Sequence, residues 1–535
     1  MSTRVTNKMM TNNARYHINQ NKAYLDKLSI QESSEKKINS PSDDPVIAVR
    51  SLRFRSALAD INQYLEKNLS DAKSWVDSTE TALDSARDLM TSLKKEATSG
   101  ANDTNSIAAC RTYYDEMKAL VDGFYDLGNS TNEDRYLFTG YRTSDSLTIS
   151  EEDLDLRNTQ VASGNPKYDY VIREEFTADD INNYTFLTAS VSSSDVTVAA
   201  TGSGTATVDD ETDIGLIDCY RIRLSYDNLT SGGSTTTVES WLTPKTIELC
   251  NADGSYDSTT YAVTEITDDT SITEANLDAG TIYFNTTTGM LIFGSDIRAA
   301  MATASDNADA LNRTGSDLSG IRFTYEKDEW ETGDLKPEHY FDCVDTALDD
   351  NLVYDDHEQE MNYSVGANQQ IQVNINAGQA FDPQVRRYID ELSDAIDAAE
   401  SAETMVAKIK EAMTTVDEDS TEYENLNYLL AAAQKELSST TDKMKSLFEN
   451  GMTEIDGFYD EVNLAATECG TTQNRVSIIE TRLTENQATV KTQASDNENI
   501  DIADIAVELS DANMIYEAAL LVTGKINQQS LLNYI

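Results

Sequence analysis

The N-terminal part of the chain, from about residue 3 to residue 127, has apolar residues at helical spacing. Over about four heptads these residues recur at intervals of three and four positions. Six of them define a candidate seam: Leu65, Leu69, Val76, Leu83, Met90 and Leu93. One narrow apolar seam on a long helix is typical of a coiled coil, although a helix in a globular bundle also fits the spacing. The narrowness of the seam favours the extended coil.

A short polar motif precedes this helical region and predicts where a helix begins. Ser42, Asp43, Asp44 and Pro45 follow one another directly. A Ser or Asp side chain can accept hydrogen bonds from the free amides at a helix start, and Pro is well suited to the first helical position. We therefore expect a helix to begin at Pro45.

The C-terminal part, from about residue 383 to residue 535, also has the helical period. Its last segment contains one apolar stripe of Ile502, Ile505, Leu509, Ala512, Tyr516 and Ala519. A second stripe contains Ile515, Ala518, Val522 and Ile526. A helix with two apolar stripes must contact more than one neighbour. From these stripes we select an assembly surface of Ile502, Ile505, Leu509, Tyr516, Val522 and Ile526.

Neither helical end has an obvious partner nearby in the sequence, so we expect the two ends to pair with each other. The predicted fold is mainly α at both termini, as a long antiparallel coiled coil or helical bundle, with an inserted β-rich region. It is α+β overall. The predicted division has terminal assembly helices in residues 1–40 and 500–535. A helical stalk with β-hairpins follows in residues 41–150 and 360–499, and a variable β-rich insertion in residues 151–359.

The middle of the chain is rich in Thr, Ser, Gly and Asp and shows β-type alternation. Residues 220–226 alternate, and residues 235–242 follow a Ser-Gly-Gly-Ser turn. Residues 280–294 resemble a hairpin, and residues 196–208 have a weaker strand pattern. We expect one or two small β-rich domains.

Length and charge restrict the function further. At 535 residues the chain is too long for one ordinary domain, and its net charge is -53. This surplus of negative charge argues against binding to nucleic acid or to anionic lipid. No window has the roughly 18 apolar residues of a membrane span, and the N-terminus lacks the apolar run of a secretory signal. The five scattered cysteines are expected to be free thiols.

No residue pattern indicates catalysis, a cofactor or a metal. His357 begins His-Glu-Gln-Glu, which lacks the second histidine of a zinc protease motif. We expect His339 and His357 to be exposed polar residues. Phosphate-binding and dinucleotide-binding glycine patterns are also missing from the sequence. Trp241 and Trp330 fit the core of a small β domain, and a carbohydrate- or receptor-binding face is the alternative.

Four stretches resemble the bacterial flagellin superfamily, and within it the hook–filament junction proteins of the FlgL type. Residues 38–45 read I-N-S-P-S-D-D-P, similar to the family's N-P-S-D-D-P, and residues 132–141 read N-E-D-R-Y-L-F-T-G-Y. Residues 363–376 are similar to a returning hairpin of the family, and the terminal S-L-L-N-Y-I is similar to S-L-F-D-Y-I. The hairpin motif residues are Arg135, Tyr136, Phe138, Gly140, Tyr141, Gly366 and Asn374.

The resemblance implies a structural subunit of the flagellum rather than an enzyme. It implies export without a cleaved signal peptide, through a narrow channel and with a cytosolic chaperone, to an extracellular position. The implied partners are another hook-associated protein on the hook side, flagellin on the filament side and further copies of the chain in a ring. The terminal helices would become ordered as subunits stack. The insertion is longer than in a minimal junction protein, so the resemblance says nothing about what the insertion does. A flagellin filament subunit, or a flagellar adhesin that binds through the insertion, remains an alternative.

Overall fold

The computed structural model describes residues 7–154, 170–231, 243–257, 261–278, 280–310, 320–346, 352–355 and 359–532. The chain forms two compact units. The terminal unit contains residues 1–73, 363–371 and 474–535, and the central unit contains residues 74–362 and 372–473. Each unit therefore combines residues from both halves of the chain. The three-part division expected from the sequence stays a prediction.

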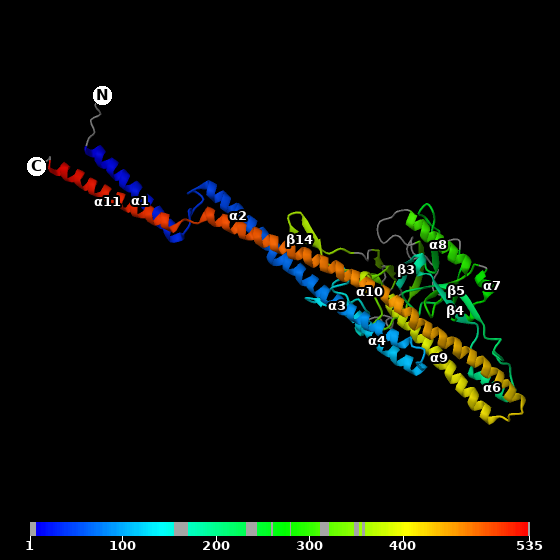
Figure 1. Ribbon diagram of the computed structural model, residues 1–535. Coiled ribbons are helices and arrows are strands. Elements are labelled where there is room, and N and C mark those ends of the chain that lie inside the picture. Colours follow the sequence, from blue (N-terminus) through cyan, green and yellow to red (C-terminus); the bar gives the residue numbers. More distant parts are fainter. Residues whose placement is uncertain are drawn as a thin grey trace. The chain divides into compact units, whose positions relative to one another are not determined.

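In the terminal unit, the N-terminal and C-terminal helices lie side by side and antiparallel (Figure 1). Its elements are α1 (Asn7–Ser34), α2 (Pro45–Gln63), the π-helical turn η1 (Tyr64–Asn68), the start of α3 (Leu69–Gly100), the end of α10 (Thr421–Glu498) and α11 (Ile502–Leu532). Leu28 of α1 packs with Ile505 and Ala512 of α11. The Gln487 amide of α10 also donates to Asn62 of α2, at 2.7 Å. The predicted pairing of the two chain ends is confirmed.

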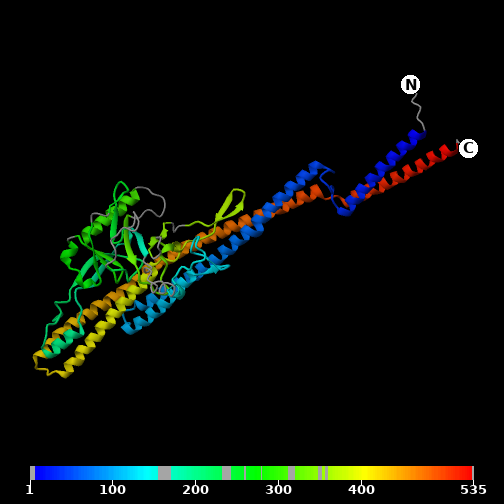
Figure 2. The ribbon, with the colours of Figure 1, turned by 180° about the vertical axis from the view of Figure 1, so that it is seen from behind.

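The helical part of the central unit is a bundle of the rest of α3, α4 (Ile107–Gly128), α9 (Gln384–Thr415) and residues 421–473 of α10. Helices α3 and α10 are antiparallel: Cys469 Sγ lies 3.5 Å from the Val76 carbonyl oxygen, and Lys94 pairs with Asp456. The Tyr125 hydroxyl of α4 donates to the Asp382 carbonyl just before α9, at 2.6 Å. Figure 2 shows α9 and α10 running side by side as a helical hairpin.

The inserted region has two sheets in the central unit. The five-stranded sheet has the order β4 (Asn182–Leu187), β5 (Leu216–Arg223), β10 (Met290–Phe293), β9 (Ile282–Asn285) and β8 (Val263–Ile266). The six-stranded sheet has the order β13 (Leu352–Tyr354), β12 (Asp342–Asp345), β3 (Tyr170–Phe176), β11 (Ile321–Lys327), β6 (Thr246–Cys250) and β7 (Tyr256–Asp257). Among the pairings described, β8–β9 is parallel. The α+β fold with a β-rich insertion is confirmed.

Short elements complete the described chain. Two small hairpins pair β1 (Thr131–Asn132) with β2 (Arg135–Tyr136) and β14 (Asn362–Gly366) with β15 (Gln369–Gln372). The remaining helices are α6 (Ser193–Thr201), α7 (Glu274–Asp278) and α8 (Ser295–Ala310). The 3-10 turns are η2 (Ala178–Asp180), η3 (Asp269–Ser271), η4 (Pro337–His339) and η5 (Ala377–Gln379).

The strand predictions for the insertion have different outcomes. The hairpin at residues 280–294 is confirmed by the antiparallel pairing of β9 and β10. The alternating segment at residues 220–226 supplies the end of β5. Residues 235–242 lie outside the described residues. The strand pattern at residues 196–208 is wrong, because residues 193–201 form helix α6.

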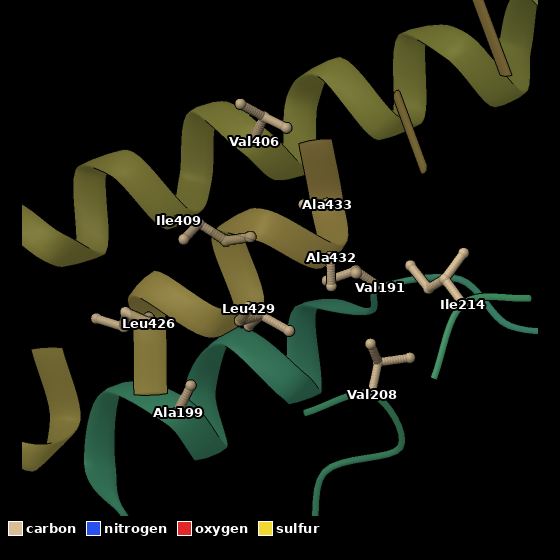
Figure 3. Close-up of a cluster of buried hydrophobic side chains, with 10 residues drawn as sticks. All are labelled: Val191, Ala199, Val208, Ile214, Val406, Ile409, Leu426, Leu429, Ala432 and Ala433. Atoms are coloured by element: carbon tan, nitrogen blue, oxygen red, sulfur yellow. The ribbon is translucent and has the colours of Figure 1, made fainter. Parts of the chain in front are cut away.

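Local capping and tertiary packing explain why α6 is a helix. The Ser192 and Asp195 side chains form a capping box at its start, and Gly202 ends it at a φ of 65°. Its small apolar residues pack against the α9–α10 hairpin (Figure 3). This tip cluster contains Val191, Ala199, Val208, Ile214, Val406, Ile409, Leu426, Leu429, Ala432 and Ala433.

A buried ionic network joins the insertion to the helical bundle. Arg221 Nη2 and Arg223 Nη1 of β5 lie 2.8 and 3.1 Å from Glu391 Oε2 of α9. Arg223 Nη2 also lies 2.9 Å from Glu454 Oε2 of α10. Burial alone would raise the pKa of Glu391, but Arg221 and Arg223 outweigh it and lower that pKa to about 2. The carboxylate therefore stays charged inside the central unit.

Two further predictions concern single side chains. All five cysteines are free thiols, as predicted, and all are buried. His339 was expected to be exposed, but it is 5% exposed. Burial, with Arg142 nearby, lowers the pKa of His339 to about 4, so the imidazole is neutral at pH 7. His357 and Trp241 lie outside the described residues, whereas Trp330 packs edge-on against Tyr170 and Tyr226.

Candidate assembly interface

One face of α11 is covered by α1 within the same chain. Ile505 and Ala512 are buried against Leu28, and Leu509 packs at the edge of this cluster. The Tyr24 hydroxyl of α1 lies 3.4 Å from the Glu508 carboxylate of α11. The two helices thus form a pair with a small apolar core of their own.

A second face of α11 presents large apolar side chains to solvent. This outer stripe is Val507 (62% exposed), Met514 (63%), Ile515 (58%), Leu521 (68%) and Val522 (56%). Positions seven apart on a helix point in nearly the same direction, because each residue turns it by about 100°. By the same geometry Val507, Met514 and Leu521 lie on the side opposite to the face that α1 covers, and Ile515 and Val522 lie about a quarter turn away from that face. Exposed apolar surface of this kind marks an interaction site.

Of the six residues selected from the sequence as an assembly surface, the structure covers some and leaves others exposed. Ile505 and Leu509 pack on α1 of the same chain, so they are not available for contact with another chain. Ile502 and Val522 are 54% and 56% exposed, and Tyr516 is half-buried. The Ile526 side chain lies outside the described residues. Only the exposed members remain candidates for contact with another chain.

The two chain segments that lead into the α1–α11 pair are tied together at Glu498. Its carbonyl oxygen accepts from the Lys37 amide at 2.8 Å, and the Ile500 amide donates to the Glu35 carbonyl at 3.1 Å. Its carboxylate lies 3.0 Å from Lys36 Nζ and 2.9 Å from Arg55 Nη2. The hydrogen bond from Arg55, followed by one from the Ser51 hydroxyl, lowers the pKa of Glu498 to about 2.

Sequence reasoning missed this joint. Arg55 and Ser51 are four residues apart on α2, so both can reach one carboxylate. The carboxylate itself comes from the other end of the chain, 443 residues from Arg55. A local pattern carries no signal for such a pair.

The polar motif before α2 lies at the predicted helix start. Asp44 is the N-cap residue, and its carboxylate accepts from the Val46 and Ile47 amides at 2.9 and 3.2 Å. Pro45 is the first residue of α2. Asp43 accepts from the amides of Ser40 and Asn39, which lower its pKa. Ser42 shares a hydroxyl–hydroxyl hydrogen bond with Ser40 at 2.7 Å.

The six seam residues predicted from the sequence do not all lie in the same unit. Leu65 is half-buried in η1 and Leu69 is buried in the terminal unit. The other four are buried in the central unit: Val76, Leu83, Met90 and Leu93. There α3 also buries Trp75 and Ala82, which lie beside the seam, so its apolar face is wider than two heptad positions. In the central unit these residues of α3 pack within the helical bundle, and their role as a coiled-coil seam stays a prediction.

The hairpin motif residues lie mostly where the chain enters and leaves the insertion. Arg135 stacks over the Trp75 ring at 5.2 Å, next to Tyr136 in β2. Phe138 is buried against Phe381, with ring centroids 4.8 Å apart. The Tyr141 hydroxyl donates to the Glu360 carbonyl at 2.9 Å.

Gly140 and Asn374 complete this region. Gly140 has a φ of 60°, and a Cβ there would lie 2.6 Å from Gln359 Oε1. Buried Asn374 accepts from the Met361 amide and donates to the Gln359 carbonyl, each at 2.7 Å. These bonds join residues 359–361 to residue 374 within the returning segment, whereas the Tyr141 bond joins that segment to the outgoing one. Gly366, by contrast, belongs to the terminal unit, at the end of β14.

Family models match both ends of the chain. The bacterial flagellin N-terminal helical region matches residues 5–143, and the bacterial flagellin C-terminal helical region matches residues 452–535. Both ends belong to the flagellin family. The family predicted from the four sequence stretches is confirmed, and flagellin-family proteins are structural proteins rather than enzymes.

Two curated flagellar proteins are similar to parts of this chain. Flagellar hook-associated protein 3 of Salmonella typhimurium is 28% identical over 142 residues, which are 26% of this chain and 44% of that protein. A flagellin of Clostridium tyrobutyricum is 27% identical over 127 residues, or 24% of this chain and 33% of that protein. The chain thus spans less than half the length of each relative.

Solved structures of flagellar junction proteins are also similar. FlgL of Xanthomonas campestris has 12% identity and a TM-score of 0.29, covering 83% of this chain and 99% of that one. The junction protein FlgL of Legionella pneumophila has 10% identity and a TM-score of 0.30, covering 84% of this chain and 99% of that one.

Among the described residues, no helix combines the length and apolar content that a membrane crossing requires.

Proposed function

We propose that the chain is a structural subunit of the bacterial flagellum that joins the hook to the flagellin filament. The outer stripe of α11 carries this proposal. Its five large apolar side chains are each more than half exposed in the isolated chain, although α11 already has an intramolecular partner in α1. A free, soluble subunit gains nothing from this exposure, whereas a subunit that stacks against copies of itself buries it.

The terminal helices are suited to becoming stable on assembly. The core of the α1–α11 pair contains few residues, and a helix pair with so small a core depends on added packing. Neighbouring copies in a ring, flagellin on one side and another hook-associated protein on the other would supply that packing. Before export, a cytosolic chaperone would cover the same stripe and keep the chain from associating too early. In this proposal the chain leaves the cell without a cleaved signal.

A charge on the outer stripe tests the proposed contact. We expect Leu521→Glu to remain folded, because the side chain is already 68% exposed, yet to fail in joining hook and filament. Asn513→Glu is the matched control, since it adds the same charge to an exposed position outside the stripe. Both variants are purified, compared by circular dichroism and used to complement a deletion strain. If Leu521→Glu restores motility as fully as the control, the outer stripe is not the assembly contact.

Imaging separates the junction role from that of a filament subunit. In a cell that lacks the gene, we expect hooks without filaments and flagellin released into the medium. Immunogold labelling of wild-type flagella should mark only the boundary between hook and filament. Label along the whole filament would instead identify the chain as a flagellin and reject the junction role.

A further inference from the structure

A pocket lies at the tip of the α9–α10 hairpin, where the insertion packs on it. Its volume is about 460 Å³, within the range of small-ligand sites. Its apolar wall includes Ala199, Val208 and Leu429, which approach one another from α6, the following loop and α10 (Figure 3). All three residues are buried members of the tip cluster. The pocket therefore rests on a packed core.

The loop that forms the opposite wall is held in place by aspartates. Asp195, itself 1% exposed, accepts from the Thr207 amide at 2.6 Å. Asp213 accepts from the Asp209 and Asp210 amides at 2.8 and 3.3 Å. Gly204, with a φ of 120°, lines the pocket without a side chain. Because its own hydrogen bonds shape the loop, a ligand would not have to order it.

Three groups around the pocket have unused hydrogen-bonding capacity. Within the described part of the chain, neither the Asp209 carboxylate, the Asn425 amide nor the Tyr428 hydroxyl is hydrogen-bonded. Tyr428 is 60% exposed, which is unusual for a ring next to a packed apolar cluster. Together they offer an acceptor, an amide that both donates and accepts, and an aromatic face.

We propose that this pocket binds a neutral saccharide of one or two rings. A carboxylate and an amide can satisfy neighbouring sugar hydroxyls, and the C–H face of a pyranose can stack on Tyr428. The lining that the structure describes contains no Lys or Arg, which disfavours an anionic ligand. Asp210 already accepts from Thr212, which leaves Asp209 as the carboxylate free for a ligand. The pocket shares no residue with the outer stripe, so binding is a function separate from assembly.

Saturation-transfer NMR on the full-length chain tests the proposal. The probes are methyl α-D-mannopyranoside, methyl β-D-galactopyranoside and N-acetyl-D-glucosamine, with putrescine as a cationic comparison. We expect at least one sugar to bind and putrescine not to compete with it. Tyr428→Ala and Asp209→Ala should each weaken binding by roughly tenfold or more. Glu418→Gln removes an exposed carboxylate from the turn before α10 and should leave binding unchanged.

Three results would overturn this assignment. The first is wild-type protein that binds none of the three sugars, and the second is putrescine that displaces the sugar. The third is sugar binding that Tyr428→Ala and Asp209→Ala leave intact. Both replaced side chains are exposed, so the variants should fold. If circular dichroism shows that either does not, Asn425→Ala replaces it in the comparison.

Discussion

Replacing Glu391 by Gln should reveal how strongly the insertion is attached to the bundle of the central unit. The substitution keeps the shape of the side chain but removes the charge that faces Arg221 and Arg223. Glu391 is 5% exposed, so water cannot take its place easily. Arg223 retains Glu454, whereas Arg221 loses the carboxylate to which it donates. A buried guanidinium without a carboxylate is costly.

The pKa of Glu391 gives the size of the effect. Burial alone would raise this pKa, but Arg221 and Arg223 lower it from 4.5 to about 2. At about 1.4 kcal/mol for each pH unit, the difference corresponds to about 3 kcal/mol of unfolding free energy. Because the folded-state pKa is the lower one, this contribution is fully present above pH 4.5. It is lost as the pH falls toward 2.

Urea unfolding at several pH values measures this contribution. At pH 7 we expect Glu391→Gln to lose about 3 kcal/mol relative to the wild type, and the difference should shrink steadily as the pH approaches 2. Glu403→Gln removes an exposed carboxylate from the same helix and should change stability by less than about 0.5 kcal/mol. A Glu391→Gln protein as stable as this control at pH 7 would refute the reasoning. So would a difference that does not depend on pH.

Three other substitutions probe the seam, the joint and the hairpin motif. Leu83→Asp places a charge at a fully buried position and should lower the free energy of unfolding by about 3 kcal/mol or more, as measured by thermal unfolding. Thr81→Asp, at an exposed position of the same helix, should lower it little. Equal melting temperatures of the two variants would mean that the seam is not packed. Glu498→Gln should speed amide hydrogen exchange in the α1–α2 connection while helix content stays constant, and unchanged exchange would reject the joint. Gly140→Ala must adopt a φ of 60° and should cost about 1–2 kcal/mol. Gly457→Ala is the control, because nothing lies within 4 Å of a Cβ at that position, and it should not be destabilising. A similar loss of stability in the Gly140→Ala and Gly457→Ala variants would argue against backbone strain at Gly140.

The sequence alone determined the helical ends, the start of α2 and the family. These features depend on local patterns: three- and four-residue spacing, a capping side chain before Pro45, and motifs of a few adjacent residues. The same is true of the β9–β10 hairpin, where apolar runs flank a turn of Thr and Gly. A local pattern is enough when the interactions that form the element join residues close in sequence.

Only the tertiary structure decided which apolar face of α11 is covered and which remains exposed. Both apolar stripes have helical spacing. They differ in exposure to solvent because α1, from the opposite end of the chain, covers one of them. Residues 193–201 have β-branched side chains suited to a strand, yet packing against α9 and α10 makes them a helix. The partners of Glu391 and Glu498 come from distant segments in the same way. Contacts between residues hundreds of positions apart leave no periodicity in the sequence. They form only when the chain folds, so a local pattern cannot predict them.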